Sequence, residues 1–343
     1  MKRAMTLRDI GKQLGLSAMT VSLALRDSPR ISAATKKRVQ VAIRGTNFVP
    51  NQLARALATG RSNLIGVIVP NSSDLYYAEV IRAIEDSASA RQFKVLLCNG
   101  SYRMETYTAH VRDMRRLHMK GIIAAPPFLG ARPRLPQFWK DLVHSDFEVV
   151  LINRQLDPPI FHQVAADYMA GVGMVAEALA ARGHRRVAYI SGHPAVLPFR
   201  QRLDVFRRCI RALGFDDDAS LLESGELTCA GGYGACQRLW QSNRRKPTAI
   251  VASNDTSAVG VLRFLEDAGL EVPQDVSIAS FDGTPFADFV HRSLTTVVTP
   301  MYEIGRQAFA TLMDAMQGGL QEPRSLILPV ELRLGESIGP APR

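Results

Sequence analysis

Cysteine is scarce in this sequence, and its few copies are not arranged in pairs. The 343 residues include four cysteines, Cys98, Cys209, Cys229 and Cys236, with no CxxC spacing among them. Zinc sites built on cysteine and disulfide frameworks both depend on regular cysteine spacing. The sequence therefore predicts neither kind of site, and a cytoplasmic protein with reduced thiols is the expected class.

Long apolar runs are also missing. No apolar stretch approaches the roughly 20 residues that span a bilayer. The first ten residues, MKRAMTLRDI, are polar where a secretion signal would carry an apolar segment. We therefore expect neither a membrane partner nor export.

The short motifs of common enzyme classes are absent as well. The sequence contains no GxGxxG or GxxxxGK[ST] phosphate loop, no HExxH metal pair and no GxSxG nucleophile turn. The glycine-rich residues 231–234 follow no apolar strand, so we interpret them as a helix start. The seven histidines are scattered, and His184, in a turn before a strand, is expected to be structural. We expect no catalytic, metal or cofactor site.

Positive charge is concentrated at one end of the chain. Residues 1–62 hold 12 of the 42 basic residues and two of the 32 acidic ones, which leaves 30 of each for the rest of the chain. A solvated helical cap on an enzyme would not predict this partition. A basic module beside a neutral body is typical of a nucleic-acid-binding protein.

Within residues 1–62, apolar residues recur at the spacing of three short helices. The apolar positions are Leu7, Ile10 and Leu14, then Val21, Ala24 and Leu25, then Val39, Ala42 and Ile43. Gly15 separates the first two helices, and Ser17 and Ser32 are the expected N-caps of the second and third. Two short helices joined by a tight turn predict a helix-turn-helix, whose second helix lies in the major groove of DNA.

From residue 64 onward, short β-branched runs alternate with amphipathic helices. The expected strands are 64–70, 94–98, 121–126, 148–153, 186–191, 248–253 and 276–281, and the expected helices include 78–91, 106–118, 169–182, 200–213 and 256–268. Such alternation predicts parallel sheets that are covered by helices on both faces. Two series of this length indicate an α/β core of two doubly wound lobes.

The sequence resembles the LacI/GalR family of bacterial transcription regulators. The resemblance is carried by TLRDIGKQLGLSAMTVSLAL, ISAATKKRVQVAI and NFVPNQLARALATGRS running into LIGVIVP, and it continues along the chain. It implies an all-α helix-turn-helix domain over residues 1–49, a hinge helix and linker over 50–62, and a periplasmic-binding-protein-like core over 63–343. The implied lobes are about 63–163 plus 292–322 and about 164–291 plus 323–339, with crossings near Val164, His291 and Pro323.

The resemblance assigns DNA contacts by position to the helix-turn-helix and the hinge. The positions are Leu7, Ser17, Ala18, Met19, Thr20, Ser22, Leu23, Arg26, Arg30, Ser32 and Thr35, and in the hinge Asn51, Ala54, Arg55 and Leu57. In the family, the leucine matched by Leu57 wedges into the minor groove at the centre of a palindromic operator. The alternative for this segment is a linker with helical composition.

The recognition helix departs from the family pattern. Relatives commonly carry an arginine where this chain has Leu23, and polar residues where it has Ala18 and Met19. The most frequent direct contact, from arginine to guanine, is therefore missing at that position. Arg26 and Arg30 contact either bases or phosphates, so the operator sequence stays open.

The resemblance also implies an effector pocket beyond the carboxyl ends of the strands. Its implied residues are Asp74, Tyr76, Tyr77, Ala125, Asn153, Asp167, Arg202, Leu227, Asn254 and Asp282. Arg202 and Asp282 are suited to bind hydroxyls or a carboxylate. The alternatives are lobe packing for the tyrosines, helix capping for Asp255 and an interlobe ion pair for Arg202. Pro198 and Leu227 replace a polar and an aromatic residue of many relatives, so the effector stays unidentified.

These features together predict a homodimeric, ligand-controlled regulator that binds double-stranded DNA. The resemblance implies a repressor of an uptake or catabolic operon for a sugar or sugar acid. The alternative is a sugar-binding protein of the periplasmic type without DNA function, which the basic helical module disfavours. A metabolic enzyme is the third interpretation, and it lacks a candidate site.

Overall fold

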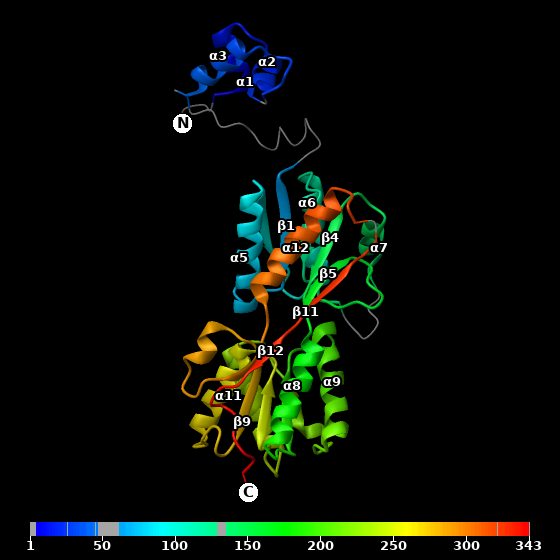
Figure 1. Cartoon of the computed structure of the whole chain (residues 1–343), viewed down its shortest axis with the longest axis vertical. Helices are drawn as coiled ribbons and strands as arrows, with labels where there is room; N and C mark the ends of the chain where they lie inside the picture. The colour runs from blue at the N-terminus through cyan, green and yellow to red at the C-terminus, as the bar shows by residue number, and fades with distance from the viewer. Residues whose placement is uncertain are drawn as a thin grey trace. The chain divides into compact units, whose positions relative to one another are not determined.

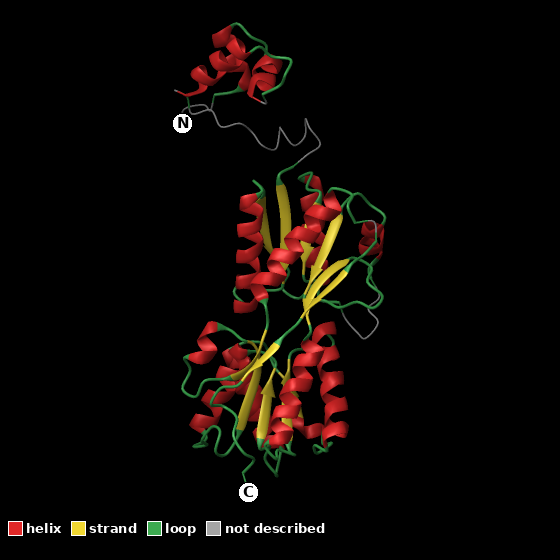
Figure 2. Cartoon of the chain, in the orientation of Figure 1, coloured by secondary structure: helices red, strands yellow, loops and turns green. Residues whose placement is uncertain are grey.

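The structure of the chain is a computed structural model, coloured along the sequence in Figure 1 and by secondary structure in Figure 2. It describes residues 5–25, 27–44, 46, 62–128, 135–320 and 322–342. The chain divides into two compact units, residues 1–59 and 60–343. The predicted DNA contacts Arg26, Asn51, Ala54, Arg55 and Leu57 lie outside the described residues.

The described part of the first unit contains three short helices. These are α1 (Leu7–Leu14), α2 (Ala18–Leu25) and α3 (Ala33–Arg44). Their fully buried apolar side chains are Ile10, Val21, Ala24 and Val39, which form one small core. All four lie on the apolar faces that the sequence periodicity predicts, so the predicted three-helix arrangement is confirmed.

Local hydrogen bonds fix where these helices begin and end. The Oγ atom of Ser17 accepts from the N–H of Thr20 at 3.0 Å, and that of Ser32 accepts from the N–H of Thr35 at 3.3 Å. Both serines therefore satisfy a backbone donor at a helix start, as predicted. Gly15 ends α1 in the left-handed conformation, with φ of 67°, which favours glycine.

The second unit contains two six-stranded sheets, and helices cover both faces of each (Figure 2). The first sheet has the order β11-β5-β4-β3-β1-β2, and all its pairings are parallel. Its strands are β1 (Leu64–Val69), β2 (Lys94–Asn99), β3 (Gly121–Ala124), β4 (Glu148–Ile152), β5 (His162–Ala166) and β11 (Ser325–Leu328). Helices α5 (Leu75–Ala90) and α12 (Met301–Met316) pack together on one face, and α6 (Met104–Arg116) and α7 (Gln137–Val143) cover the other.

The second sheet has the order β12-β10-β9-β8-β6-β7. Its strands are β6 (Val187–Ser191), β7 (Leu222–Ser224), β8 (Ala249–Ala252), β9 (Ser277–Asp282), β10 (Thr295–Val298) and β12 (Glu331–Arg333). Helices α8 (Tyr168–Ala181) and α9 (Leu197–Leu213) cover one face, and α10 (Cys229–Ser242) and α11 (Asp255–Asp267) the other. Short 3₁₀ turns span Ala219–Leu221 and Pro285–Asp288. Only the edge strand β12 departs from the parallel arrangement, since it runs antiparallel to β10.

The chain passes between the two lobes three times, a few residues later than the sequence-based positions near Val164, His291 and Pro323. The passages lie between β5 and α8, between β10 and α12, and between β11 and β12. The shift arises because strand pairing holds each segment in its sheet for longer. Strand β5 pairs with β11 as far as Ala166, and β10 pairs with β9 as far as Val298.

Two features with weak functional signals in the sequence have structural roles. The ring of His184 is fully buried between the Thr248 hydroxyl and the Gly339 carbonyl, each at 3.0 Å. Burial lowers the pKa of His184, so the neutral ring is favoured. The glycine-rich segment lies in the first turn of α10, where the Thr228 hydroxyl accepts from the N–H of Gly231 at 3.0 Å.

Candidate ligand pocket and nucleic-acid interface

A hollow of about 400 Å³, including its part open to solvent, lies between the two lobes of the second unit. It is placed at the carboxyl ends of the parallel strands, where α/β sheets bind ligands. Its lining consists of Asp74, Tyr76, Tyr77, Tyr102, Asn153, Arg154, Tyr168, Pro198, Phe199, Arg202, Leu227, Ser253, Asn254 and Asp282. Eight of the ten predicted effector residues are among these, and Ala125 and Asp167 are not.

The two predicted residues outside the lining have roles in the scaffold. The carbonyl of Ala125 accepts from the Tyr107 hydroxyl and from Nη2 of Arg154, both at 2.8 Å. Asp167 is the N-cap of α8, and its carboxylate accepts from the N–H of Ala170 at 3.0 Å. Both residues therefore support elements that frame the hollow.

Arg202 is held by aromatic rings and a carbonyl rather than by an acid. Its guanidinium carbon lies 3.5 Å from the ring centroid of Tyr168 and 5.3 Å from that of Phe281. Its Nη1 donates to the Ser253 carbonyl at 3.2 Å, and its buried Nε has no hydrogen-bond partner. No carboxylate in the described part of the chain lies within 4.0 Å of this guanidinium, so the described residues form no interlobe ion pair through Arg202.

Asp282 ends β9 with a strained backbone and a buried carboxyl group. Its φ of 107° is in the region that L-residues rarely adopt. Such strain is found where the surrounding structure holds a side chain for a purpose. Burial raises the pKa of Asp282 well above its usual range, and the nearby Asp255 raises it further. The charge of Arg202 opposes this rise, so burial and a neighbouring arginine act on the carboxyl in opposite directions.

Asp255 lies behind Asp282 and is a structural residue. One carboxylate oxygen accepts from the hydroxyls of Ser280 at 2.6 Å and Thr296 at 2.7 Å. The other accepts from the N–H and the hydroxyl of Thr284. Four hydrogen bonds satisfy this buried carboxylate and tie β9 to β10. Capping of α11 falls instead to the preceding residue, Asn254.

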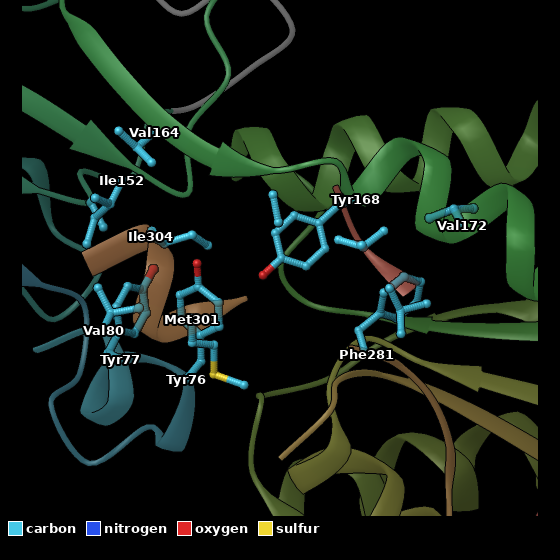
Figure 3. Close-up of a cluster of buried hydrophobic side chains, with 14 of the residues drawn as sticks. Tyr76, Tyr77, Val80, Ile152, Val164, Tyr168, Val172, Phe281, Met301 and Ile304 are labelled. Carbon is cyan, nitrogen blue, oxygen red and sulfur yellow. The ribbon is translucent and has the colours of Figure 1, made fainter. Parts of the chain in front are cut away.

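The predicted tyrosines combine both roles that the sequence left open. The rings of Tyr76 and Tyr77 are buried in the core and meet edge to face, with centroids 5.0 Å apart. Figure 3 shows them near Met301 of α12, with the hydroxyl of Tyr168 pointing toward them. The buried hydroxyls of Tyr76 and Tyr168 interact with each other from the two lobes, so both rings frame the hollow as well as packing in the core.

Five lining residues were missed by the sequence analysis: Tyr102, Arg154, Tyr168, Phe199 and Ser253. Ser253 directly follows a strand and Arg154 follows one after a single residue, so the rule that ligands bind at strand ends could have found both. Phe199 and Tyr168 lie on the first turns of helices, and periodicity alone assigns them to the core. Tyr102 lies in a loop and has a left-handed backbone, with φ of 53°, which the sequence does not signal.

In the first unit, the two faces of α2 differ sharply in exposure. Val21 and Ala24 are buried against the other helices. The predicted contacts in and just before α2 are all at least partly exposed: Ser17, Ala18, Met19, Thr20, Ser22 and Leu23. Met19 is 67% exposed, and an apolar side chain of this kind can contact the thymine methyl group. The exposed face of α2 thus presents small, apolar and hydroxyl side chains to solvent.

The remaining predicted contacts in the described part of the first unit are also accessible. Arg30 and Ser32 are exposed, and Leu7 and Thr35 are partly exposed. One of the two acids of this unit, Asp27, pairs with Lys36 at 2.6 Å. The acids of this unit are too few to neutralise its basic side chains, which leaves an excess of positive charge for phosphates.

Two other classes of site have no candidate in the described residues. No helix there is long and apolar enough to cross a bilayer. The same residues contain no cluster of three or more histidine, cysteine, aspartate or glutamate side chains that could hold a metal ion.

Comparison with known proteins covers nearly the whole chain. Residues 6–51 match the family described as bacterial regulatory proteins, lacI family, and residues 176–338 match the periplasmic binding protein-like domain. Catabolite control protein A of Priestia megaterium is 28% identical over 333 residues, which are 97% of this chain and 98% of that protein. The ribose operon repressor of Escherichia coli (strain K12) is 26% identical over 341 residues, 97% of this chain and 99% of that protein.

Among solved structures, one match is a lac repressor dimer bound to operator and the anti-inducer ONPF. Its TM-score is 0.85 at 23% identity, and the match covers 98% of this chain and 99% of the other. At this identity the likeness concerns the fold. A helical unit and a two-lobed core therefore occur together in one chain of a known structure.

Proposed function

The chain belongs to the LacI/GalR family of bacterial transcription regulators, and from that membership we propose that it is a ligand-controlled, sequence-specific DNA-binding regulator. The observation that carries the proposal is the combination of a basic helix-turn-helix unit with a two-lobed core that encloses a hollow. Within this function, a repressor of an uptake or catabolic operon for a sugar or sugar acid is the best-supported role. The ribose operon repressor is among its relatives.

The proposed macromolecular partner is double-stranded operator DNA with a palindromic sequence. A homodimer with twofold symmetry presents two recognition helices, which fit two half-sites related by the same symmetry. The DNA partner places the protein in the cytoplasm. This function requires neither catalysis nor a cofactor.

Control by the effector follows from the position of the hollow between the lobes. A ligand shifts an equilibrium only by its difference in affinity for the two states. A ligand that contacts Asp74 in one lobe and Arg202 in the other binds differently when the angle between the lobes changes, because it can reach both residues at only some angles. Such a ligand therefore has different affinities for the two states. We propose that this change of angle alters how the two DNA-binding units of a dimer are held.

Selection of DNA from a random pool by the full chain tests this proposal. We expect the recovered sequences to share a palindrome, and small molecules that bind the hollow to change the affinity for that palindrome. Recovery of random sequence, together with loss of all binding at physiological salt, would contradict it.

A further inference from the structure

The described residues include three buried arginines, and their partners differ. Arg154, Arg186 and Arg202 are 2%, 8% and 3% exposed. Arg186 lies outside the hollow and pairs with Asp218 at 2.8 Å and Asp216 at 3.4 Å. Such pairing is the ordinary requirement for a buried charge, because desolvation is costly without it.

The two arginines that line the hollow have no acidic partner in the described part of the chain. Arg202 contacts the Tyr168 ring and one carbonyl. Arg154 donates from Nη1 to the Asn153 carbonyl at 2.7 Å, from Nη2 to the Ala125 carbonyl at 2.8 Å and from Nε to the Pro126 carbonyl. Carbonyls orient both groups but leave their positive charge unbalanced.

The acids of the hollow do not balance these charges either. Asp74 and Asp282 are the two lining carboxyls. Burial raises the pKa of both, and that of Asp282 well above its usual range, while the charge of Arg202 opposes the rise at Asp282. Asp255 stands outside the lining, where its carboxylate oxygens accept four hydrogen bonds. Neither lining carboxyl lies within 4.0 Å of a guanidinium nitrogen of Arg154 or Arg202, so the lining holds two permanently charged groups without a direct acidic partner among the described residues.

We propose that the effector is a small polyhydroxylated carboxylate, a sugar acid rather than a neutral sugar, whose negative charge is balanced by Arg154 and Arg202. This inference rests on the proposed function and names the ligand class of its pocket. The two arginines come from different lobes, so the anion draws the lobes together. Hydroxyl groups of the ligand fit the amides of Asn153 and Asn254 and the carboxyl of Asp282.

Calorimetric titration of the full chain at pH 7 tests the ligand class. The probes are D-gluconate against D-glucose, and D-galacturonate against D-galactose, with D-glucose 6-phosphate as a second anion. We expect at least one acid to bind about tenfold or more tightly than its matched sugar, because a buried charge pair discriminates strongly. Equal or tighter binding of the neutral sugars, preference for the phosphate, or no binding of either acid would overturn the proposal.

Matched variants locate the charge effect. In Arg202→Met the preference for the acid over its neutral sugar should fall at least tenfold, and Arg154→Lys should retain most of it. Arg200→Met is the control, because Arg200 lies two residues away on α9, outside the lining, with a half-exposed side chain. An unchanged preference in a folded Arg202→Met protein would contradict the assignment. If that variant does not fold, Arg154→Met provides the same comparison from the other lobe.

A DNA titration in parallel separates the two levels of inference. If the full chain binds DNA in a salt-dependent manner but prefers neutral sugars, the ligand class is wrong and the regulator function stands. If DNA binding is absent, the proposed function fails whatever the ligand.

Discussion

The N-terminal unit and the core differ in what holds them together and in what they present to solvent. The first has a buried apolar set of four side chains and carries nine of the ten units of net positive charge. The second has extended cores on both faces of two sheets, and its acidic and basic residues nearly balance. DNA affinity therefore depends on the charge of the first unit, and ligand control depends on the packing of the second. We expect that each property can be changed without the other.

The largest expected effect is on DNA affinity as salt is raised. Counterion release lowers log affinity by about 0.9 per neutralised phosphate for each unit of log salt, so six contacts cost roughly a thousandfold between 50 and 200 mM. Fluorescence anisotropy with a labelled duplex measures this slope. Ligand affinity of the core, measured in the same buffers, should change much less. A DNA affinity that does not change with salt concentration would contradict the assignment of DNA binding to the charge of the first unit.

The small core of the first unit makes it sensitive to a single truncation. Ile10→Ala removes a fully buried side chain, which costs about 2–5 kcal/mol. We expect loss of DNA binding while the main thermal transition of the core, followed by calorimetry, stays in place. The control is Val41→Ala, because Val41 is 61% exposed on α3 and should tolerate the change. A shift of the core transition in Ile10→Ala would mean that the units are not independent.

Leu57 offers a test of the hinge, whose residues lie outside the described part of the chain. By family resemblance its side chain wedges into the operator centre, where unstacking costs a few kcal/mol and flexible pyrimidine–purine steps deform most easily. Leu57→Ala should weaken specific binding by about ten- to a hundredfold and leave salt-driven nonspecific binding nearly unchanged. Replacing the central step by a stiff one should harm the wild type more than the variant. Equal losses would mean that Leu57 does not contact the operator centre.

Arg202→Ala sharpens the comparison from the core side. It removes the guanidinium that lies on Tyr168 in the hollow, so effector binding should no longer change DNA affinity. DNA binding without effector should stay within about twofold of the wild type, because the first unit is untouched. Arg200→Ala serves as the control on the same helix. A normal effector response in the folded Arg202→Ala variant would show that Arg202 does not bind the effector.

The smallest effect concerns pH. The pKa of Asp282 in the folded protein is raised above its ordinary value of 3.8. The folded protein therefore loses free energy of unfolding as the pH rises from 3.8 through the raised pKa, because the carboxyl ionises more readily in the unfolded chain. Asp282→Asn removes this cost. Its melting temperature relative to the wild type should therefore increase between pH 5 and pH 8, by about 2 °C for each kcal/mol recovered. A constant difference across this range would show that the carboxyl does not titrate there.

Much of the fold could be predicted because its signals are local. The strands at 64–69, 94–99 and 148–152 are β-branched runs of ordinary length, and helical periodicity marks α2. Strands β7, β10, β11 and β12 were not predicted, since they have three or four residues and mixed polarity. They become strands only by pairing with neighbours that are distant in sequence.

The pocket could be predicted in outline, and its charge balance could not. Asp282 ends a strand and Asn153 directly follows one, and the sequence shows both positions. The aromatic rings that Arg202 contacts, Tyr168 and Phe281, come from α8 and β9 of its own lobe, and these contacts depend on how that lobe's helices pack on its sheet. In the sequence, nothing distinguishes Arg154 from a surface arginine. In the structure it is buried, and it donates hydrogen bonds to three backbone carbonyls. Pairing and desolvation of charges are properties of the assembled core.

The three passages between the lobes have a consequence for how the protein is made. The first sheet lacks its edge strand until Leu328 has been synthesised, and the second until Arg333. The ribosome therefore synthesises almost the whole polypeptide before either lobe can complete its sheet, whereas the three described helices of the first unit are complete after residue 44. Domains fold as units, from the N-terminus onward. A nascent chain of this regulator thus acquires its DNA-binding helices long before it acquires a pocket to control them.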